Sequence, residues 1–149
     1  MLHIHELCPH CGASMKSFEH SLSSGIVSAL VKAIQYVHKA GKNEFHLQRD
    51  LTDLTKSEYA NFQKLRFHAL VAKVDEKAGY WLITKRGGQF LRGEISVPAR
   101  VKTFRNKVIG HSPDTVSIRQ YRDKVPNFES QFAYEYQVPR EAESLALFN

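Results

Sequence analysis

The spacing of apolar residues predicts a long helix in the first third of the chain. Along residues 22–40, apolar positions recur every three or four residues, as on the buried face of an amphipathic helix. Ser23 or Ser24 can cap the start of this helix, and Gly41 can end it.

The clearest helical pattern lies at residues 56–70. Thr55 and Glu58 form a T-x-x-E capping box, in which each side chain accepts a hydrogen bond from the other residue's backbone amide. One apolar stripe is expected to face the core, namely Tyr59, Phe62, Leu65, Ala69 and Leu70. The opposite face is expected to be exposed and carries Ser57, Asn61, Lys64 and His68.

Short strands are predicted around these two helices. A strand is expected at residues 44–47, followed by a brief helix near residues 48–54. Residues 71–74 and 80–84 predict a β-hairpin with glycine at its tip, and residues 85–93 predict a final short helix.

Beyond Pro98 the pattern changes from helical to extended. Residues 101–109 and 115–121 are rich in β-branched and aromatic side chains, and residues 111–114 between them have turn chemistry. A second β-hairpin is therefore expected, followed by an aromatic tail from Pro126 that packs on the body.

A motif with a recognisable spacing lies at the end of the predicted helical body. Tyr80-Trp-Leu-Ile-Thr-Lys-Arg-Gly87 is followed by Phe90 and Leu91. This spacing resembles the Y-x-L-T-x-x-G-x-x-[FL]-L pattern that ends the winged helix-turn-helix domain of MarR- and PadR-type regulators and their archaeal and phage relatives. The order of the expected elements is similar as well, over residues 22–93. The resemblance implies a recognition helix that runs into the first wing strand, although winged helices also serve as protein-interaction modules.

The net charge of +6 is concentrated in one part of the chain. Residues 1–84 carry ten basic and eight acidic side chains, whereas residues 85–124 carry ten basic and three acidic ones, which gives +7. Residues 125–149 carry one basic and four acidic side chains. Because a local basic stripe can bind phosphates, DNA is the expected partner. A solvated basic surface without a polyanion partner is the alternative.

The expected DNA contacts fall into two groups. Asparagine can bond bidentately to adenine and lysine can reach guanine or phosphate, so four residues of the recognition helix would enter the major groove: Ser57, Asn61, Lys64 and His68. Eight basic residues would contact phosphates: Lys85, Arg86, Arg92, Lys102, Arg105, Lys107, Arg119 and Arg122. The wing tip at residues 75–79 has two acids and one base, which makes it a poor phosphate clamp. An ordinary solvated helix face is the alternative interpretation.

The chain's two cysteines form one motif, Cys8-Pro-His-Cys11-Gly12, which resembles the zinc knuckle of a rubredoxin-like or zinc-ribbon site. Two thiolates at this spacing can bind one ion, and histidines or a second chain would have to supply the other ligands. The expected structural zinc site consists of Cys8, Cys11 and His20, with His5 or His3 as the fourth ligand. A redox C-x-x-C and a metal-free pair of thiols are the alternatives.

The sequence therefore predicts an α+β fold, a winged helix-turn-helix with an N-terminal zinc knuckle and an additional C-terminal β-hairpin. The expected segments are a zinc-knuckle segment at 1–20, a winged-helix domain at 21–93, and a hairpin extension with its tail at 94–149. The expected function is that of a small zinc-stabilised DNA-binding regulator of phage or prokaryotic type, acting as a homodimer. The alternative is a winged-helix adaptor or inhibitor that binds protein and no nucleic acid.

Several other classes are disfavoured. The chain has no glycine-rich phosphate loop, no G-x-S-x-G, no H-E-x-x-H and no paired acids, so it is not expected to be an enzyme. No apolar run approaches the roughly 18 residues of a membrane span, and the N-terminus does not resemble a signal peptide. Two cysteines are too few for a disulfide-dense scaffold, and a cytoplasmic location is expected.

Overall fold

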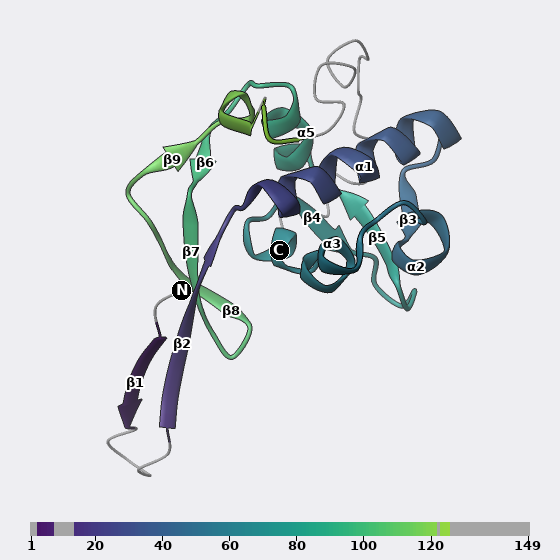
Figure 1. The fold of residues 1–149 in the computed structure, drawn as a ribbon. Coiled ribbons are helices and arrows are strands. Elements are labelled where there is room, and N and C mark those ends of the chain that lie inside the picture. The colour runs from purple at the N-terminus through teal and green to yellow at the C-terminus, as the bar shows by residue number, and fades with distance from the viewer. Residues whose placement is uncertain (1–2, 8–13, 122, 126–149) are drawn as a thin grey trace.

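The computed structural model describes residues 3–7, 14–121 and 123–125, with side chains from residue 17 onward. It mixes helices and strands along the chain, so the α+β class is confirmed (Figure 1). The helices are α1 (Ser24–Ala40), α2 (Leu47–Asp50), α3 (Lys56–Asn61), α4 (Lys64–Phe67) and α5 (Lys85–Leu91). The strands are β1 (His3–Leu7), β2 (Ser14–Ser21), β3 (Glu44–His46), β4 (Val71–Lys73), β5 (Tyr80–Ile83), β6 (Val97–Pro98), β7 (Arg100–Phe104), β8 (Lys107–His111) and β9 (Thr115–Val116). Among the described residues, no helix combines the length and apolarity needed to cross a bilayer.

Helix α1 is delimited by the two signals that the sequence carries. The Ser23 side chain accepts a hydrogen bond from the backbone amide of Ile26 at 3.4 Å, which caps the first turn. Gly41 follows the last turn with a φ of 65°, a left-handed conformation that glycine adopts without steric cost. The buried face of α1 includes Val27, Leu30 and Ile34.

A three-stranded antiparallel sheet packs with the helices around one core. Its strand order is β3-β5-β4, so the chain enters on one edge and the β4–β5 hairpin completes the sheet. Phe62 packs edge-to-face on Phe45 and on Trp81, with ring centroids 5.9 and 5.4 Å apart. These contacts join the helical layer to the sheet, because Phe45 lies in β3 and Trp81 in β5.

The helix expected at residues 56–70 is divided into α3 and α4 by a turn at residues 62–63. The capping box at Thr55 and Glu58 forms as expected. Two positions of the expected apolar stripe differ, since Tyr59 is 45% exposed and Ala69, at a φ of 59°, lies in the turn after α4. Glu58 takes the inward position one residue before Tyr59, and Phe62 and Leu65 continue that face at helical spacing.

The expected second hairpin, with residues 101–109 paired to residues 115–121, does not form, and a different hairpin forms within residues 100–111. Strands β7 and β8 are joined by the two-residue turn Arg105–Asn106, whose φ values of 50° and 63° are those of a type I′ turn. Residues 115–116 instead form β9 and pair with β6, and residues 118–121 form a 3₁₀ helix. The expected turn was misplaced because Arg-Asn lacks the glycine that usually marks a type I′ turn.

The N-terminal strands belong to the same sheet as the C-terminal hairpin. The four-stranded sheet has the order β1-β2-β7-β8, and β2 pairs antiparallel with β7 so that His20 lies opposite Val101. In Figure 1 this sheet lies to one side of the helical body, with β2 leading directly into α1. The segments predicted as separate, residues 1–20 and 94–149, therefore share one sheet over the parts that the structure describes.

Helix α5 packs closely on the loop that follows α4. Thr84 caps α5 by accepting from the Gly87 amide at 3.0 Å, and its hydroxyl donates to the Ala69 carbonyl at 2.7 Å. A Cβ added at Gly87 would lie 2.2 Å from the Leu70 carbonyl oxygen, so only glycine fits there. This contact fixes the start of α5 against the α4–β4 loop.

Candidate functional site

The exposed face of residues 56–64 is free of acidic side chains. Lys56, Ser57, Tyr59 and Gln63 are exposed, and Lys64 is partly exposed. Glu58, the one acid in this segment, is buried on the opposite side. The surface that helices α3 and α4 present to solvent is therefore neutral or positive.

Glu58 is held inward by an ion pair with α1. Lys32 Nζ lies 2.7 Å from Glu58 Oε1 and also donates to the Asp53 carbonyl at 2.9 Å. Burial on its own would raise the pKa of Glu58, but hydrogen bonds from Lys32, the Thr55 amide and Ser28 hold that pKa below its usual value. The Glu58 carboxylate is thus ionised, and its interactions are with groups inside the fold and not with solvent.

Asn61 and Lys64 occupy different environments on the exposed side. Asn61 Nδ2 donates to the Ser57 carbonyl at 2.9 Å, so one of its two amide hydrogens is engaged along the helix. Lys64 is partly exposed, and its charge helps to lower the pKa of His20, after the larger effect of burial. Lys64 therefore lies at the border between α4 and the four-stranded sheet.

His68 was expected on the exposed face and is instead buried, with 3% of its surface accessible. Helix α4 ends at Phe67, and the following turn directs residue 68 toward the interior. Helical spacing predicts that His68 lies on the same face as Lys64. Because α4 ends before residue 68, that spacing does not apply to His68, and the prediction that it is exposed is wrong.

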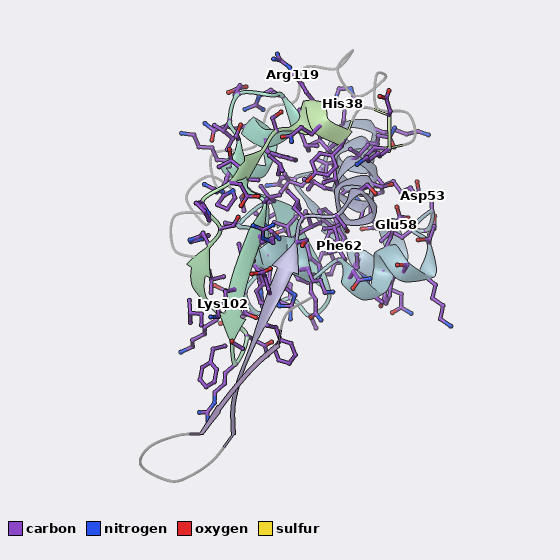
Figure 2. All side chains as sticks on the ribbon, turned by 60° about the vertical axis from the view of Figure 1, so that its left-hand side comes forward. His38, Asp53, Glu58, Phe62, Lys102 and Arg119 are labelled. Atoms are coloured by element: carbon purple, nitrogen blue, oxygen red, sulfur yellow. The ribbon has the colours of Figure 1, made fainter. Side chains whose placement is uncertain are left out.

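The basic residues at 85–119 do not form one stripe. Lys102 alternates in β7 with the buried residues Val101 and Thr103, so it points to the opposite face of the sheet. Figure 2 shows Arg119 and Lys102 at well-separated positions, both distant from Glu58. Arg92 forms an ion pair with Glu94. The remaining residues of this group are Lys85, Arg105 and Lys107, which are exposed, Arg86, which is half-buried, and Arg122, which lies outside the described residues.

His20 lies far along β2 from the turn end of the β1–β2 hairpin, where the sequence carries the C-x-x-C motif. Cys8 and Cys11 lie outside the described residues, between Leu7 of β1 and Ser14 of β2, which are paired at the turn end of the hairpin. His20 is six residues farther along β2 than Ser14, which is about 20 Å at the rise of a β-strand. The described strand geometry therefore disfavours His20 as a ligand, and the expected ligand set stays a prediction.

His20 has other partners. Its Nε2 atom lies 3.0 Å from Thr103 Oγ1, and its ring stacks on Phe67 with centroids 5.1 Å apart. His3 and His5 lie on β1, opposite Phe18 and Lys16 respectively. Among the residues that the structure describes, no group of three or more His, Cys, Asp or Glu is arranged to hold a metal ion.

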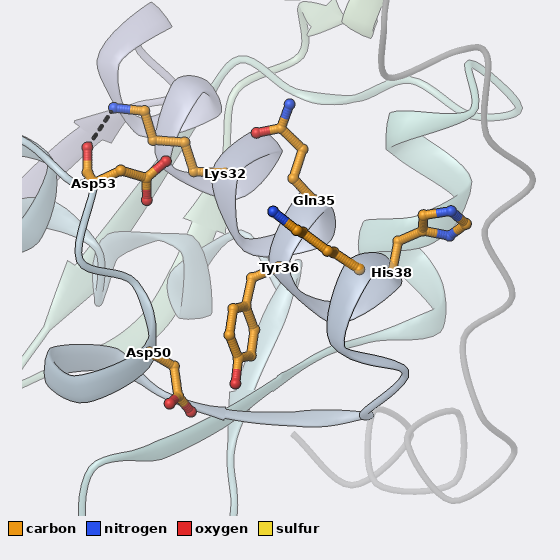
Figure 3. A pocket seen from close by; sticks show the side chains of 7 residues that line it. Lys32, Gln35, Tyr36, His38, Asp50 and Asp53 are labelled. Atoms are coloured by element: carbon orange, nitrogen blue, oxygen red, sulfur yellow. Dashed lines mark hydrogen bonds between the residues drawn. The ribbon is translucent and has the colours of Figure 1, made fainter.

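A pocket of about 640 Å³ lies beside α1 and the α2–α3 connection (Figure 3). Figure 3 shows Tyr36 pointing from α1 toward Asp50, whereas His38 points the other way. Two lysines and two aspartates line this pocket, and Lys32 is already bonded to Asp53 and Glu58. The lysines and aspartates in its described lining are equal in number, so charge of one sign does not dominate there.

A second pocket, of about 370 Å³, lies between α4, α5 and the β7–β8 hairpin. It contains the buried His68 together with Arg86 and His111. The sequence interpretation assigned His68 and Arg86 to a DNA surface and did not bring them together.

Comparison with protein-family models, with curated proteins and with solved structures gives no match for this chain.

Proposed function

We propose that residues 22–93 form a winged helix-turn-helix domain that binds duplex DNA through the exposed face of α3 and α4. The single observation that carries the proposal is the acid-free surface of residues 56–64, created by the inward rotation of Glu58. DNA is a dense polyanion, so a helix that enters its major groove has to keep carboxylates off the approaching face.

The topology of the domain supports the proposal. The order helix, strand, three helical segments, hairpin and helix resembles that of a winged helix, and a strand order of β3-β5-β4 is the arrangement that such an order produces. In this arrangement α3 and α4 occupy the place of the recognition helix, and the β4–β5 hairpin is the wing. Ser57, Asn61 and Lys64 are the proposed groove contacts, together with Lys56 and Gln63, which the helical pattern places at the edges of the same face.

The proposal changes which phosphate contacts are expected. Lys85 at the start of α5 stays a candidate because it is exposed. Lys102 and Arg119 are not assigned to the same DNA surface, because they point to separate faces (Figure 2). Few cationic side chains then act together, so we infer modest affinity with a shallow salt dependence.

The test is an anisotropy titration of the full chain against a short labelled duplex of mixed sequence at two salt concentrations. Binding should weaken as salt rises, because each neutralised phosphate releases a counterion. Lys64→Ala should weaken binding by about 1–3 kcal/mol if Lys64 reads a base, or lower the salt slope by about 1 if it contacts a phosphate.

Lys42→Ala is the matched control, since Lys42 is exposed in the turn after α1 and is not part of the proposed contact face at residues 56–64. It should leave binding unchanged. The proposal fails if the chain binds duplex at low salt no better than an unrelated neutral protein. It also fails if the two lysine variants behave alike.

One observation favours the second candidate function, a protein-interaction module. In the described part of the chain β8 is an edge strand, and it exposes 39% of Val108 and 56% of Ile109. An exposed apolar edge can pair with a strand from another chain. Co-purification of a stoichiometric protein partner without nucleic acid, lost in Ile109→Lys, would favour this function over DNA binding.

A further inference from the structure

The pocket between the helical body and the β7–β8 hairpin contains buried polar atoms without partners. His68 is 97% buried, and neither of its ring nitrogens has a hydrogen-bond partner in the described part of the structure. The Nε atom of Arg86 is likewise buried and unpartnered there. Burying such groups without hydrogen bonds is costly, so native proteins rarely leave several of them together without a ligand or ordered water.

The charge around this pocket has one sign. Its described lining holds Arg86, His68 and His111 and no acidic side chain. Burial, followed by the charges of His20, Arg86 and His111, lowers the pKa of His68 to about 4. His68 is therefore neutral at physiological pH and offers one N–H donor and one acceptor, while Arg86 supplies the positive charge.

The rest of the lining is apolar. Phe67 comes from α4, and Pro98 and Val101 come from the segment that leads into β7 and from β7 itself. A volume of about 370 Å³ exceeds what a water molecule or a simple ion needs. Polar groups at one side of an apolar pocket are the usual arrangement for orienting a small organic ligand.

We propose that this pocket binds a small organic anion whose carboxylate or phosphate group accepts hydrogen bonds from Arg86 Nε and His68, with its apolar part against Phe67, Pro98 and Val101. An oxyanion satisfies both orphaned donors and the unbalanced positive charge at once. Neutral ligands satisfy the donors only, and cations oppose the charge. His111, which is exposed, stands at the solvent side of the site.

The pocket beside α1 provides an internal comparison. It is larger, but its lysines and aspartates balance, and none of its side-chain atoms is among the buried atoms without a partner. The proposal therefore rests on the combination of burial, missing partners and one-sided charge, which the described residues bring together only around His68 and Arg86.

The experiment is an isothermal titration of the full chain with three probes of similar size: phenyl phosphate, benzoate and benzyl alcohol. At least one of the two anions should bind, and benzyl alcohol should bind at least tenfold more weakly. Comparison of the two anions shows which oxyanion the site prefers. The His68 imidazole resonances, followed by nuclear magnetic resonance, should shift with the same dissociation constant.

Variants of neighbouring residues give the control. Arg86→Gln should weaken anion binding about tenfold or more, because it removes a charge-assisted hydrogen bond. Lys85→Gln removes the adjacent exposed charge and should leave the dissociation constant unchanged. Should Arg86→Gln fail to fold, Arg86→Lys keeps the charge while losing the Nε–H donor and should still weaken binding.

Three results would overturn the proposal. One is the absence of binding by either anion at millimolar concentration. Another is equal binding of benzyl alcohol, which would make the pocket a general apolar cavity. The last is equal loss of affinity in the Lys85 and Arg86 variants, which would indicate diffuse electrostatic attraction instead of a site.

Discussion

Lys32 Nζ lies 2.7 Å from Glu58 Oε1, and this contact joins the middle of α1 to the first turn of α3. The same carboxylate oxygen accepts from the Thr55 amide at 2.8 Å, so one atom serves both the helix cap and the ion pair. Glu58 is buried and Lys32 is mostly buried. The pair therefore determines how α3 is rotated on the body and which residues it exposes.

Removing the lysine should destabilise the fold. Lys32→Met leaves Glu58 as a buried carboxylate without its cation, at a cost of about 2–4 kcal/mol in the free energy of unfolding. Urea denaturation at pH 7 measures this loss. The Lys77–Glu44 pair is exposed and serves as the control, so Lys77→Met should change little. Equal effects of the two variants would contradict the assigned role of Lys32.

The buried His68 should make stability depend on pH. Its pKa of about 4 in the folded chain lies below the ordinary value of 6.5, so the unfolded chain binds more protons between these values. Stability is then intact above pH 6.5 and falls toward pH 4, by up to about 3 kcal/mol from this group. His20 acts in the same direction, because burial and Lys64 also lower its pKa.

Comparing the His68→Gln variant with the unmodified chain isolates the contribution of His68 to the pH dependence of stability. His68→Gln keeps a neutral polar side chain and should flatten the curve of unfolding free energy between pH 4.5 and 6.5 compared with the unmodified chain. Carboxylates that titrate in the same range affect both proteins equally. If the two curves of unfolding free energy against pH run parallel, His68 has an ordinary pKa in the folded chain and the prediction is wrong.

Zinc content should depend on the cysteines and not on His20. The C-x-x-C motif predicts a bound ion, whereas the strand register places His20 about 20 Å along β2 from the turn end. Elemental analysis of protein prepared without chelator should give close to one equivalent for the unmodified chain and for His20→Ala, and a loss for Cys8→Ser. Less than half an equivalent in the unmodified chain would argue against the knuckle altogether.

Two glycine-to-alanine substitutions should change the stability of the fold in opposite directions. At Gly87 an added Cβ would lie 2.2 Å from a backbone oxygen that cannot move independently, so Gly87→Ala should cost about 3 kcal/mol or more. At Gly25 in α1 nothing lies within 4 Å of the added Cβ, and Gly25→Ala should stabilise by roughly 0.5–1 kcal/mol through helix propensity. Thermal unfolding of the two variants provides the measurement.

Local signals in the sequence were enough to predict most of the body. The capping box at Thr55, the serine cap and Gly41 end of α1, and the hairpin at residues 71–83 all form near their expected positions. Each depends on a few neighbouring residues whose hydrogen bonds or φ angles are specified locally. Periodicity also identified Phe62 and Leu65 as buried.

What the sequence did not reveal depends on contacts between distant segments. The inward position of Glu58 requires Lys32, 26 residues earlier, and the burial of His68 requires the β7–β8 hairpin. The strand β2 could not be predicted without its partner β7, because its own residues have little β-propensity or alternation. Contacts between distant segments also explain why the predicted site residues fall into two places, the exposed surface of α3 and the interior pocket around His68.

The pairing of β2 with β7 also has a consequence for how the chain folds. His20 and Val101 face each other across about eighty residues of intervening sequence, whereas the contacts within the helical body are much closer along the chain. Closing so long a loop is entropically expensive and slow, and the closure becomes cheaper once the intervening body is already compact. During synthesis β2 can pair with β7 only after β7 has emerged, whereas β1 and β2 can pair with each other earlier. We therefore expect the helical body to assemble before β2 pairs with β7, so that the pocket around His68 is among the final features to form.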